Sequence, residues 1–197
     1  MSIPVYIALL HYPVVNRNGT VVTTAVTNMD IHDISRSGKT FGVSGFFIVT
    51  PIEDQHELIN RILAHWRSDS ARSYNKDRFE AVSLVRLAWS FDEVKAAIKA
   101  ECGKEPEVVL TDAKQLPNSI SCAKYRLELV GRLCSGNFDK PLVLVFGTGW
   151  GVSELFYPMV DRVLEPILGP GGEEGYNHLS VRAAVAIILD RLFSWNR

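Results

Sequence analysis

Residues 176–192 read YNHLSVRAAVAIILDRL, in which a polar cluster runs directly into an apolar segment with helical character. The residues from Ala183 to Leu189 are all apolar. A helix of this composition has apolar side chains on every side, so it must be covered all round. The run is too short to span a membrane. We therefore expect one side of this helix to pack on a sheet of the same chain, and the other side to pack on a further element or on a second copy of the chain.

The composition is that of an ordinary soluble protein. The 197 residues are 47% hydrophobic and 22% charged, with a formal net charge of −1, so no overall positive field attracts nucleic acid. The opening MSIPVYIALLHYPV has no basic region before its apolar run, which predicts a first strand rather than a signal peptide. We expect a cytoplasmic protein without a membrane segment.

Cysteine and histidine are sparse and scattered. Cys102, Cys122 and Cys134 are an odd number without metal-ligand spacing, and the five histidines add no recognisable motif. We therefore expect free thiols and no metal site. Since neither an internal repeat nor a long linker divides the chain, residues 1–197 are expected to form one domain.

Strand-like and helix-like segments alternate along the chain. Strands are predicted at 5–10, 45–50, 82–87, 108–111, 142–146 and 162–167, and helices at 31–41, 55–66, 91–102, 122–134 and 153–160. Asn18-Gly19 predicts a turn before a short β-prone run at 21–26. The alternation predicts an α/β fold, a mainly parallel sheet with helices on both faces.

Two glycine-rich segments follow predicted strands. In LVLVFGTGWGV, residues 142–152, the glycines allow a backbone to approach a ligand closely, although a plain turn that needs positive φ would also explain them. In LEPILGPGGEEGYNHLSV, residues 164–181, the glycine-rich centre at 169–175 is a candidate lid. Because both loops follow strands and lie close to the last helix, we expect them to converge on one crevice at the carboxyl ends of neighbouring strands.

Two nucleotide-binding patterns fit less well. RSGKT, residues 36–40, ends like a P-loop, but Asp33 stands where the pattern needs a glycine, and a carboxylate would repel phosphate. A conventional dinucleotide fold could be built around Gly147–Gly151, with Glu165 on a ribose hydroxyl. Too little chain follows Gly151 for the strands that such a fold needs.

Three blocks in a fixed order carry a more specific resemblance: DIHDISRSGKTFGV at 30–43, LVLVFGTGWGV at 142–152 and YNHLSVRAAVAIILDRL at 176–192. Together they resemble the SPOUT family of RNA methyltransferases that use S-adenosylmethionine (SAM), in particular a small bacterial group that also occurs fused to tRNA guanine methyltransferases. The resemblance covers nearly all of the chain. It implies a deep C-terminal trefoil knot that holds the cofactor, and a homodimer that methylates tRNA or rRNA.

The resemblance also implies a set of cofactor-binding residues. They lie at the ends of three strands and at the start of the last helix: Leu110, Thr111, Phe146, Gly147, Thr148, Gly149, Gly151, Glu165, Pro166, Ile167, Leu168, Tyr176, Asn177, Leu179 and Ser180. From the residues alone, Asn177 or Ser180 could instead simply cap the last helix.

The candidate catalytic residues are Arg36 and Asp33, which the resemblance indicates, and His178, which lies close in sequence to the expected pocket. Arg36 lies where many knotted methyltransferases keep an arginine for the RNA phosphate or the target nucleotide, and Asp33 lies where relatives often have asparagine. His178 is a candidate base or proton relay, or else a residue that orders its loop. Relatives commonly carry a glutamate where this chain has Thr148, which leaves the methyl acceptor open.

Residues 65–81, HWRSDSARSYNKDRFEA, are the best local candidate for RNA contact. Basic side chains there could bind phosphates while aromatic ones stack on bases, the basic ones being Arg67, Arg72, Lys76 and Arg78. Acidic residues offset most of this charge, so an exposed loop laced with salt bridges is the alternative. No separate RNA-binding module is visible, and RNA recognition could therefore need the dimer groove or an additional protein partner.

Three functions follow in order of preference. The first is a homodimeric SAM-dependent methyltransferase that acts on tRNA or rRNA. The second is a conventional nucleotide-binding enzyme domain built around Gly147–Gly151. The third is a knotted module that binds cofactor or RNA without turnover.

Overall fold

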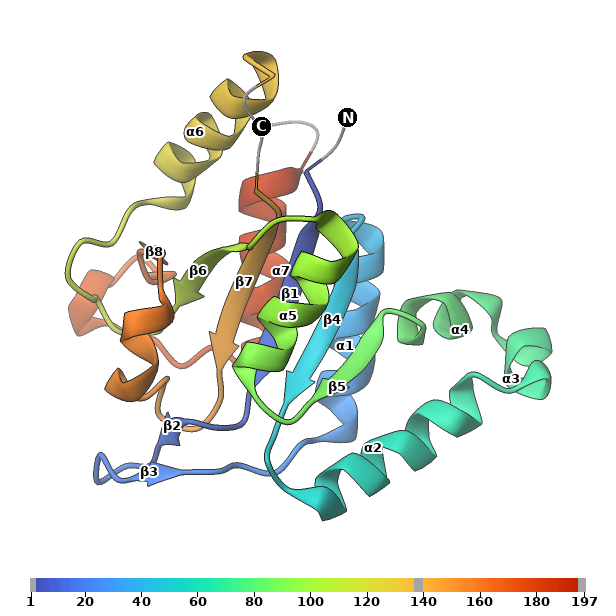
Figure 1. The fold of residues 1–197 in the computed structure, drawn as a ribbon. Coiled ribbons are helices and arrows are strands. Elements are labelled where there is room, and N and C mark those ends of the chain that lie inside the picture. Colours follow the sequence, from blue (N-terminus) through green and yellow to red (C-terminus); the bar gives the residue numbers. More distant parts are fainter. Residues whose placement is uncertain (1–2, 137–139, 195–197) are drawn as a thin grey trace.

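A parallel sheet forms the centre of the molecule (Figure 1). The structure, a computed structural model, describes residues 3–136 and 140–194. Within them the main sheet has six strands in the order β5-β4-β1-β7-β6-β8, and every neighbouring pair is parallel. The strands are β1 (Val5–Leu10), β4 (Gly45–Val49), β5 (Val85–Ala88), β6 (Glu107–Thr111), β7 (Leu142–Gly147) and β8 (Arg162–Leu164). The predicted α/β fold is confirmed.

Helices cover both faces of this sheet because successive side chains of a strand point to opposite faces. Ile7 and Leu9 of β1 lie in one core with α1 (Asn28–Thr40), α6 (Cys122–Cys134) and α7 (Val181–Phe193). Tyr6 and Ala8 lie in a second core with α5 (Phe91–Cys102) and the 3-10 helix η1 (Glu154–Met159). In Figure 1, α5 lies in front of the sheet, and α1 and α7 lie behind it.

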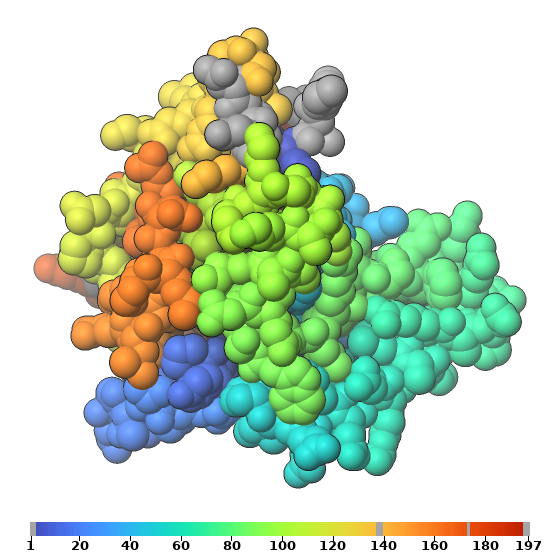
Figure 2. All heavy atoms as spheres, viewed as in Figure 1, coloured from blue at the N-terminus to red at the C-terminus, as the bar shows by residue number. Residues whose placement is uncertain are grey.

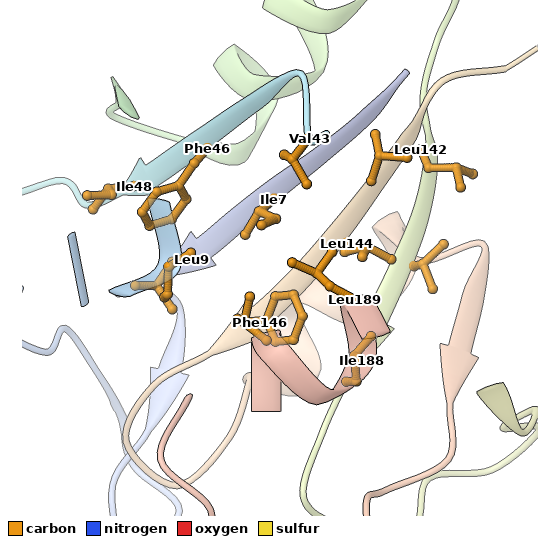
Figure 3. Packing of buried hydrophobic residues seen from close by; sticks show 14 of the residues in the cluster. Ile7, Leu9, Val43, Phe46, Ile48, Leu142, Leu144, Phe146, Ile188 and Leu189 are labelled. Carbon is orange, nitrogen blue, oxygen red and sulfur yellow. The ribbon is translucent and has the colours of Figure 1, made fainter. Parts of the chain in front are cut away.

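The last helix packs on the centre of the sheet, as its apolar run predicted. Ile188 and Leu189 face Leu144 and Phe146 of β7 (Figure 3). The helix also contacts α1 on one side and α6 on the other. Ala183 and Ile187 remain half-buried in the single chain, so the predicted cover by a second copy stays a prediction.

Helices α2 (Glu53–Trp66), α3 (Asp69–Tyr74) and α4 (Lys76–Val82) form a lobe beside the β5 edge of the sheet (Figure 1). The alternative interpretation of 65–81 as an exposed loop is wrong, because Ser68 and Asn75 cap two short helices by accepting from the backbone N–H of Ala71 and Arg78. The predicted strand 82–87 also began too early, since Val82 belongs to the last turn of α4.

Four other segments differ from their predicted form. The predicted strand 162–167 ends at Leu164, the last residue of β8. Only Val21–Val22 of the run 21–26 is a strand (β3), and it pairs with β2 (Val14–Val15) across the predicted Asn18-Gly19 turn. The predicted helix 153–160 is the 3-10 helix η1, which contains Pro158. The glycine-rich segment 169–175 holds a short 3-10 helix, η2 (Gly172–Glu174). Within the described part of the chain, every helix is too short or too polar to cross a bilayer.

Candidate functional site

A cleft of about 920 Å³ opens at the carboxyl ends of β6, β7 and β8. Its walls come from five stretches of chain, at 24–30, 111–115, 146–151, 165–168 and 175–188. Pockets for small molecules and cofactors commonly enclose roughly 300–1,000 Å³. The two glycine-rich loops therefore converge on one crevice large enough for a nucleoside cofactor, as the positions of their strands predicted.

The loop after β7 needs its glycines for its backbone path and for close packing. Gly149 and Gly151 have φ of +62° and +107°, values that favour glycine. A Cβ on Gly151 would lie 2.9 Å from a carboxylate oxygen of Asp112. The loop is also tied to β2, because Trp150 donates its N–H to the carbonyl of Val15 at 2.9 Å. The loop is thus a positive-φ turn, as one interpretation predicted, and it also lines the cleft, while its approach to a ligand stays a prediction.

Asp112, which immediately follows β6, is a lining residue that the sequence interpretation missed. Its carboxylate accepts from the N–H of Lys114 at 2.9 Å. Burial raises the pKa of Asp112, although this backbone N–H and those of Val152 and Ala113 act in the opposite direction. The residue could have been found by the rule already applied to its neighbours, because it stands at the carboxyl end of a parallel strand.

The segment before α7 closes the cleft from another side. Asn177 donates its side-chain N–H to the carbonyl of Ala113 at 3.0 Å, and so joins this segment to the loop after β6. Ser180 is the N-cap of α7 and accepts from the N–H of Ala183 at 3.3 Å, as the capping interpretation predicted. His178 lines the cleft and contacts the ring of Tyr176 edge-on, with centroids 5.2 Å apart.

Most of the predicted cofactor residues lie together in the wall of this cleft. These are Thr111, Phe146, Gly147, Thr148, Gly149, Gly151, Glu165, Pro166, Ile167, Leu168, Asn177, Leu179 and Ser180. The structure does not bring the other two into the wall. Leu110 is wholly buried in the sheet, and Tyr176 projects from the surface with 86% of its area exposed.

A partly buried hydrogen-bond chain leads from the cleft wall to His11. Thr148 donates its hydroxyl to the carbonyl of Leu10 at 3.0 Å and contacts the hydroxyl of Thr24, which in turn lies 3.0 Å from Nδ1 of His11. Because Thr148 donates onward, Thr24 donates to Thr148 and accepts from the Nδ1–H of His11. Burial lowers the pKa of His11 to about 4, while the nearby Asp30 carboxylate raises it. The imidazole is therefore neutral at pH 7, and its buried Nε2 has no hydrogen-bond partner among the described residues.

An ion-pair network connects the cleft to α1. Arg182 lines the cleft and donates to the buried Asp30 at 2.9 Å, while its Nε lies 3.4 Å from Asp33. Asp33 and the exposed Arg36 line a separate, shallower hollow of about 350 Å³ on the surface of α1. Of the three predicted catalytic residues, only His178 lies in the cleft wall. The pairing of Arg182 with Asp30 was missed because the two residues are 152 positions apart in sequence and lie in different blocks, neither of which points to the other.

The basic residues predicted to bind RNA lie on the α2–α4 lobe, away from the β8 edge of the sheet. Arg67 donates to the carbonyls of Val82 and Val85. Arg78 stacks on Trp66, with its guanidinium carbon 4.6 Å from the ring centroid. Both side chains therefore hold the lobe together. Arg72 lies over the ring of Phe79, and Lys76 lies 3.8 Å from the exposed carboxylate of Glu80.

Cysteine, histidine and carboxylate side chains do not gather into a group that could hold a metal ion anywhere in residues 3–136 and 140–194. The cysteines Cys102, Cys122 and Cys134 are free thiols. The cleft is instead suited to an organic ligand, since it combines apolar side chains, carboxylates and backbone N–H groups.

The comparison with protein families identifies the chemistry. A profile of SAM-dependent RNA methyltransferases matches residues 4–194, nearly the whole chain. The chain belongs to this family. The predicted methyltransferase assignment and its cofactor are therefore confirmed, and the preference over a conventional nucleotide-binding domain agrees with the position of the glycine loop after β7, in the middle of the sheet.

Two relatives show that members of the family occur both in short and in long proteins. An uncharacterized protein of Aquifex aeolicus is 44% identical over 193 residues, covering 98% of this chain and 90% of that protein. A protein of Oleidesulfovibrio alaskensis named tRNA (guanine-N(1)-)-methyltransferase is 41% identical over 187 residues, which cover 95% of this chain. The match spans only 41% of that longer relative.

The solved structures support the fold. The crystal structure of TrmJ from Z. mobilis superposes with a TM-score of 0.61 at 12% sequence identity, covering 98% of this chain and 69% of that chain. Such a similarity shows a shared architecture, and it confirms the predicted SPOUT fold class. The path of the chain through the knot stays a prediction.

Proposed function

We propose that the cleft binds SAM and that this chain transfers its methyl group to RNA. The observation that carries the proposal is the convergence of three strand-following loops on one cleft that suits each part of the cofactor. The apolar side chains of Ile167, Leu168 and Leu179 can pack against adenine. Glu165 can accept from the ribose hydroxyls, and Asp112 adds a carboxylate that suits the positive charges of the methionine part.

We further propose that residues 1–197 form one knotted domain, which works as a homodimer in the cytoplasm. The bond between Asn177 and Ala113 supports the knot, because it holds the segment before α7 against the loop after β6 while α7 returns to the centre of the sheet. The half-buried apolar side chains of α7, including Ala183 and Ile187, support a subunit contact along this helix.

Bound SAM supplies a methyl group that is already activated, so the protein has to position the acceptor, exclude water and receive a proton. Arg36 is exposed in its hollow on α1 and is suited to an RNA phosphate. His178 in the cleft wall is the candidate base. Asp33 pairs with Arg182, and we assign it the task of orienting that arginine at the rim of the cleft.

The RNA is proposed to be a tRNA, because the name of the longer relative from Oleidesulfovibrio alaskensis specifies a tRNA. Arg72 and Lys76 on the α2–α4 lobe can add contacts to its phosphates. Arg67 and Arg78 are engaged within the lobe, so they support this surface rather than form it.

Two experiments test these proposals. Calorimetric titration should show binding of SAM and none of NAD, and a preference for NAD would overturn the cofactor assignment. Methyl transfer from labelled SAM to bulk tRNA should fall at least about tenfold in Arg36→Ala, with unchanged SAM affinity. Arg61→Ala is the matched control, because the side chain of Arg61 on α2 is 81% exposed. A wild-type chain that binds SAM but transfers no methyl group would favour the module without turnover.

A further inference from the structure

Helix α6 has an apolar outer face. Ala123, Leu127, Val130 and Cys134 are all exposed, and their spacing of four, three and four residues places them in one stripe along the helix. Leu127 and Val130 are 72% and 46% exposed. The opposite face already packs into the core beside α7 through its own apolar side chains, including the buried Tyr125 and Leu129. We call the four exposed residues the α6 stripe.

This pattern is unusual for a helix at a protein surface, which normally has one apolar face toward the core and a polar face toward water. A second apolar face on the same helix indicates that a partner covers it. A seam with alternating spacings of three and four is the pattern by which one helix packs along another. The stripe therefore fits a helix of a partner protein.

The α6 stripe lies at the end of the molecule where the described chain starts and finishes. Arg126 of α6 donates to the carbonyls of Arg191 and Ser194 at the end of α7, at 3.2 and 2.8 Å. β1 and β7 run parallel, and Leu142 at the start of β7 donates to the carbonyl of Pro4 at 2.9 Å. Figure 1 shows α6 at the same end of the molecule as the last turn of α7 and the start of β1, and Figure 2 shows it as an outer ridge on this view of the surface.

The longer relative indicates what lies next to this end. In the Oleidesulfovibrio alaskensis protein, a segment 41% identical to this chain makes up only 41% of the length. The rest of that protein joins the shared segment at one or both of its ends, and the described residues near these ends, Pro4 and Ser194, lie on the side of the molecule where α6 lies. Whichever end is used, the additional part enters next to the α6 stripe.

We propose that the α6 stripe is a docking surface for a separate tRNA (guanine-N(1)-)-methyltransferase, which takes the place of the additional part of the longer relative. The inference rests on the proposed function, since it pairs two enzymes that act on the same class of RNA. The cleft opens at the carboxyl ends of the strands, whereas the stripe extends toward their amino ends. Docking therefore leaves the cleft open to its own cofactor and RNA.

Sedimentation velocity with the full chain and the tRNA (guanine-N(1)-)-methyltransferase of the same organism tests this proposal. The wild-type mixture should contain a complex of the two proteins. The double variant Leu127→Glu/Val130→Glu should raise the dissociation constant at least about tenfold, because it places two charges in the seam. Leu58→Glu is the matched control, since Leu58 on α2 is 45% exposed and lies outside the stripe, and it should bind like wild type.

The milder pair Leu127→Ser/Val130→Thr should also raise the dissociation constant of the complex. This pair is the control for the case in which the charged variant misfolds. The absence of a complex in the wild-type mixture, or equal binding by the stripe variants, would overturn the proposal. So would a stripe variant that alters only the self-association of this chain, because a second copy would then be the occupant. SAM titration of the same variants should match wild type, which separates failure of docking from failure of the cofactor assignment.

Discussion

The buried imidazole of His11 makes the stability of the fold depend on pH in a way that can be calculated. Burial lowers its pKa from 6.5 to about 4 in the folded protein. Between these values the unfolded chain holds a proton on His11 that the folded chain does not, so unfolding takes up a proton and acid favours it. The stabilisation is complete above about pH 6.5 and is lost as the pH falls toward 4. One pKa unit corresponds to about 1.4 kcal/mol, so about 2 kcal/mol should be lost between neutral pH and pH 5.

Urea unfolding of the wild type and of His11→Asn at pH 7, 6 and 5 measures this effect. Asparagine can still donate an N–H to Thr24, so the hydrogen-bond chain to Thr148 can persist, but it cannot take up the proton. The variant should be less stable at pH 7, yet the difference between the two proteins should shrink by about 2 kcal/mol at pH 5. Shifts at other groups, such as the raised pKa of Asp112, cancel in that difference. A difference that stays constant with pH would refute a neutral, buried His11.

Three further predictions follow from contacts around the cleft and the helical lobe. Gly151→Ala should lower both thermal stability and SAM affinity, because the new Cβ would lie 2.9 Å from a carboxylate oxygen of Asp112 and the residue has φ +107°. Its control, Gly131→Ala, lies in open space on α6 and should raise the free energy of unfolding in urea by up to about 1 kcal/mol. Arg182→Met should cost about 3 kcal/mol by leaving Asp30 buried and unpaired, and adding Asp30→Asn should recover part of this loss in a double-mutant cycle. Arg67→Ala should lower the melting temperature without changing tRNA affinity in a filter-binding assay, because the Arg67 guanidinium is hydrogen-bonded to backbone carbonyls. A loss of tRNA affinity without a loss of stability would show instead that Arg67 contacts the RNA.

The central sheet was predictable because its strands are short apolar runs buried on both faces. Val5–Leu10 and Leu142–Gly147 are of this kind, and the helices between the strands carry the period of an amphipathic helix. The short helices α3 and α4 were not predictable from the same signals. Their charges are mixed, and Val82 has the β-propensity of a strand residue although it is buried in the last turn of α4. Packing of α4 against α1 decides the conformation there.

The site could be predicted where it follows from the sheet and was missed where it depends on contacts distant in sequence. Loops at the carboxyl ends of parallel strands must meet, which placed Gly147–Gly151 and Glu165 correctly in the cleft wall. Asp30 and Arg182 meet across 152 positions of sequence, and neither has a motif that points to the other. Thr24 reaches the cleft from an irregular segment after β3, where no periodicity marks the fold.

Different parts of the molecule lie at the two ends of the parallel sheet. All six strands of the described sheet point the same way, so the loops that follow them gather at one end and build the cleft for cofactor and acceptor. At the other end lie the first residues of β1, the end of α7 and the arginine of α6 that binds it. A protein docked at this second end, as we propose for the α6 stripe, does not enter the cleft. A segment similar to this chain accordingly makes up 90% of the Aquifex aeolicus protein and 41% of the longer Oleidesulfovibrio alaskensis protein.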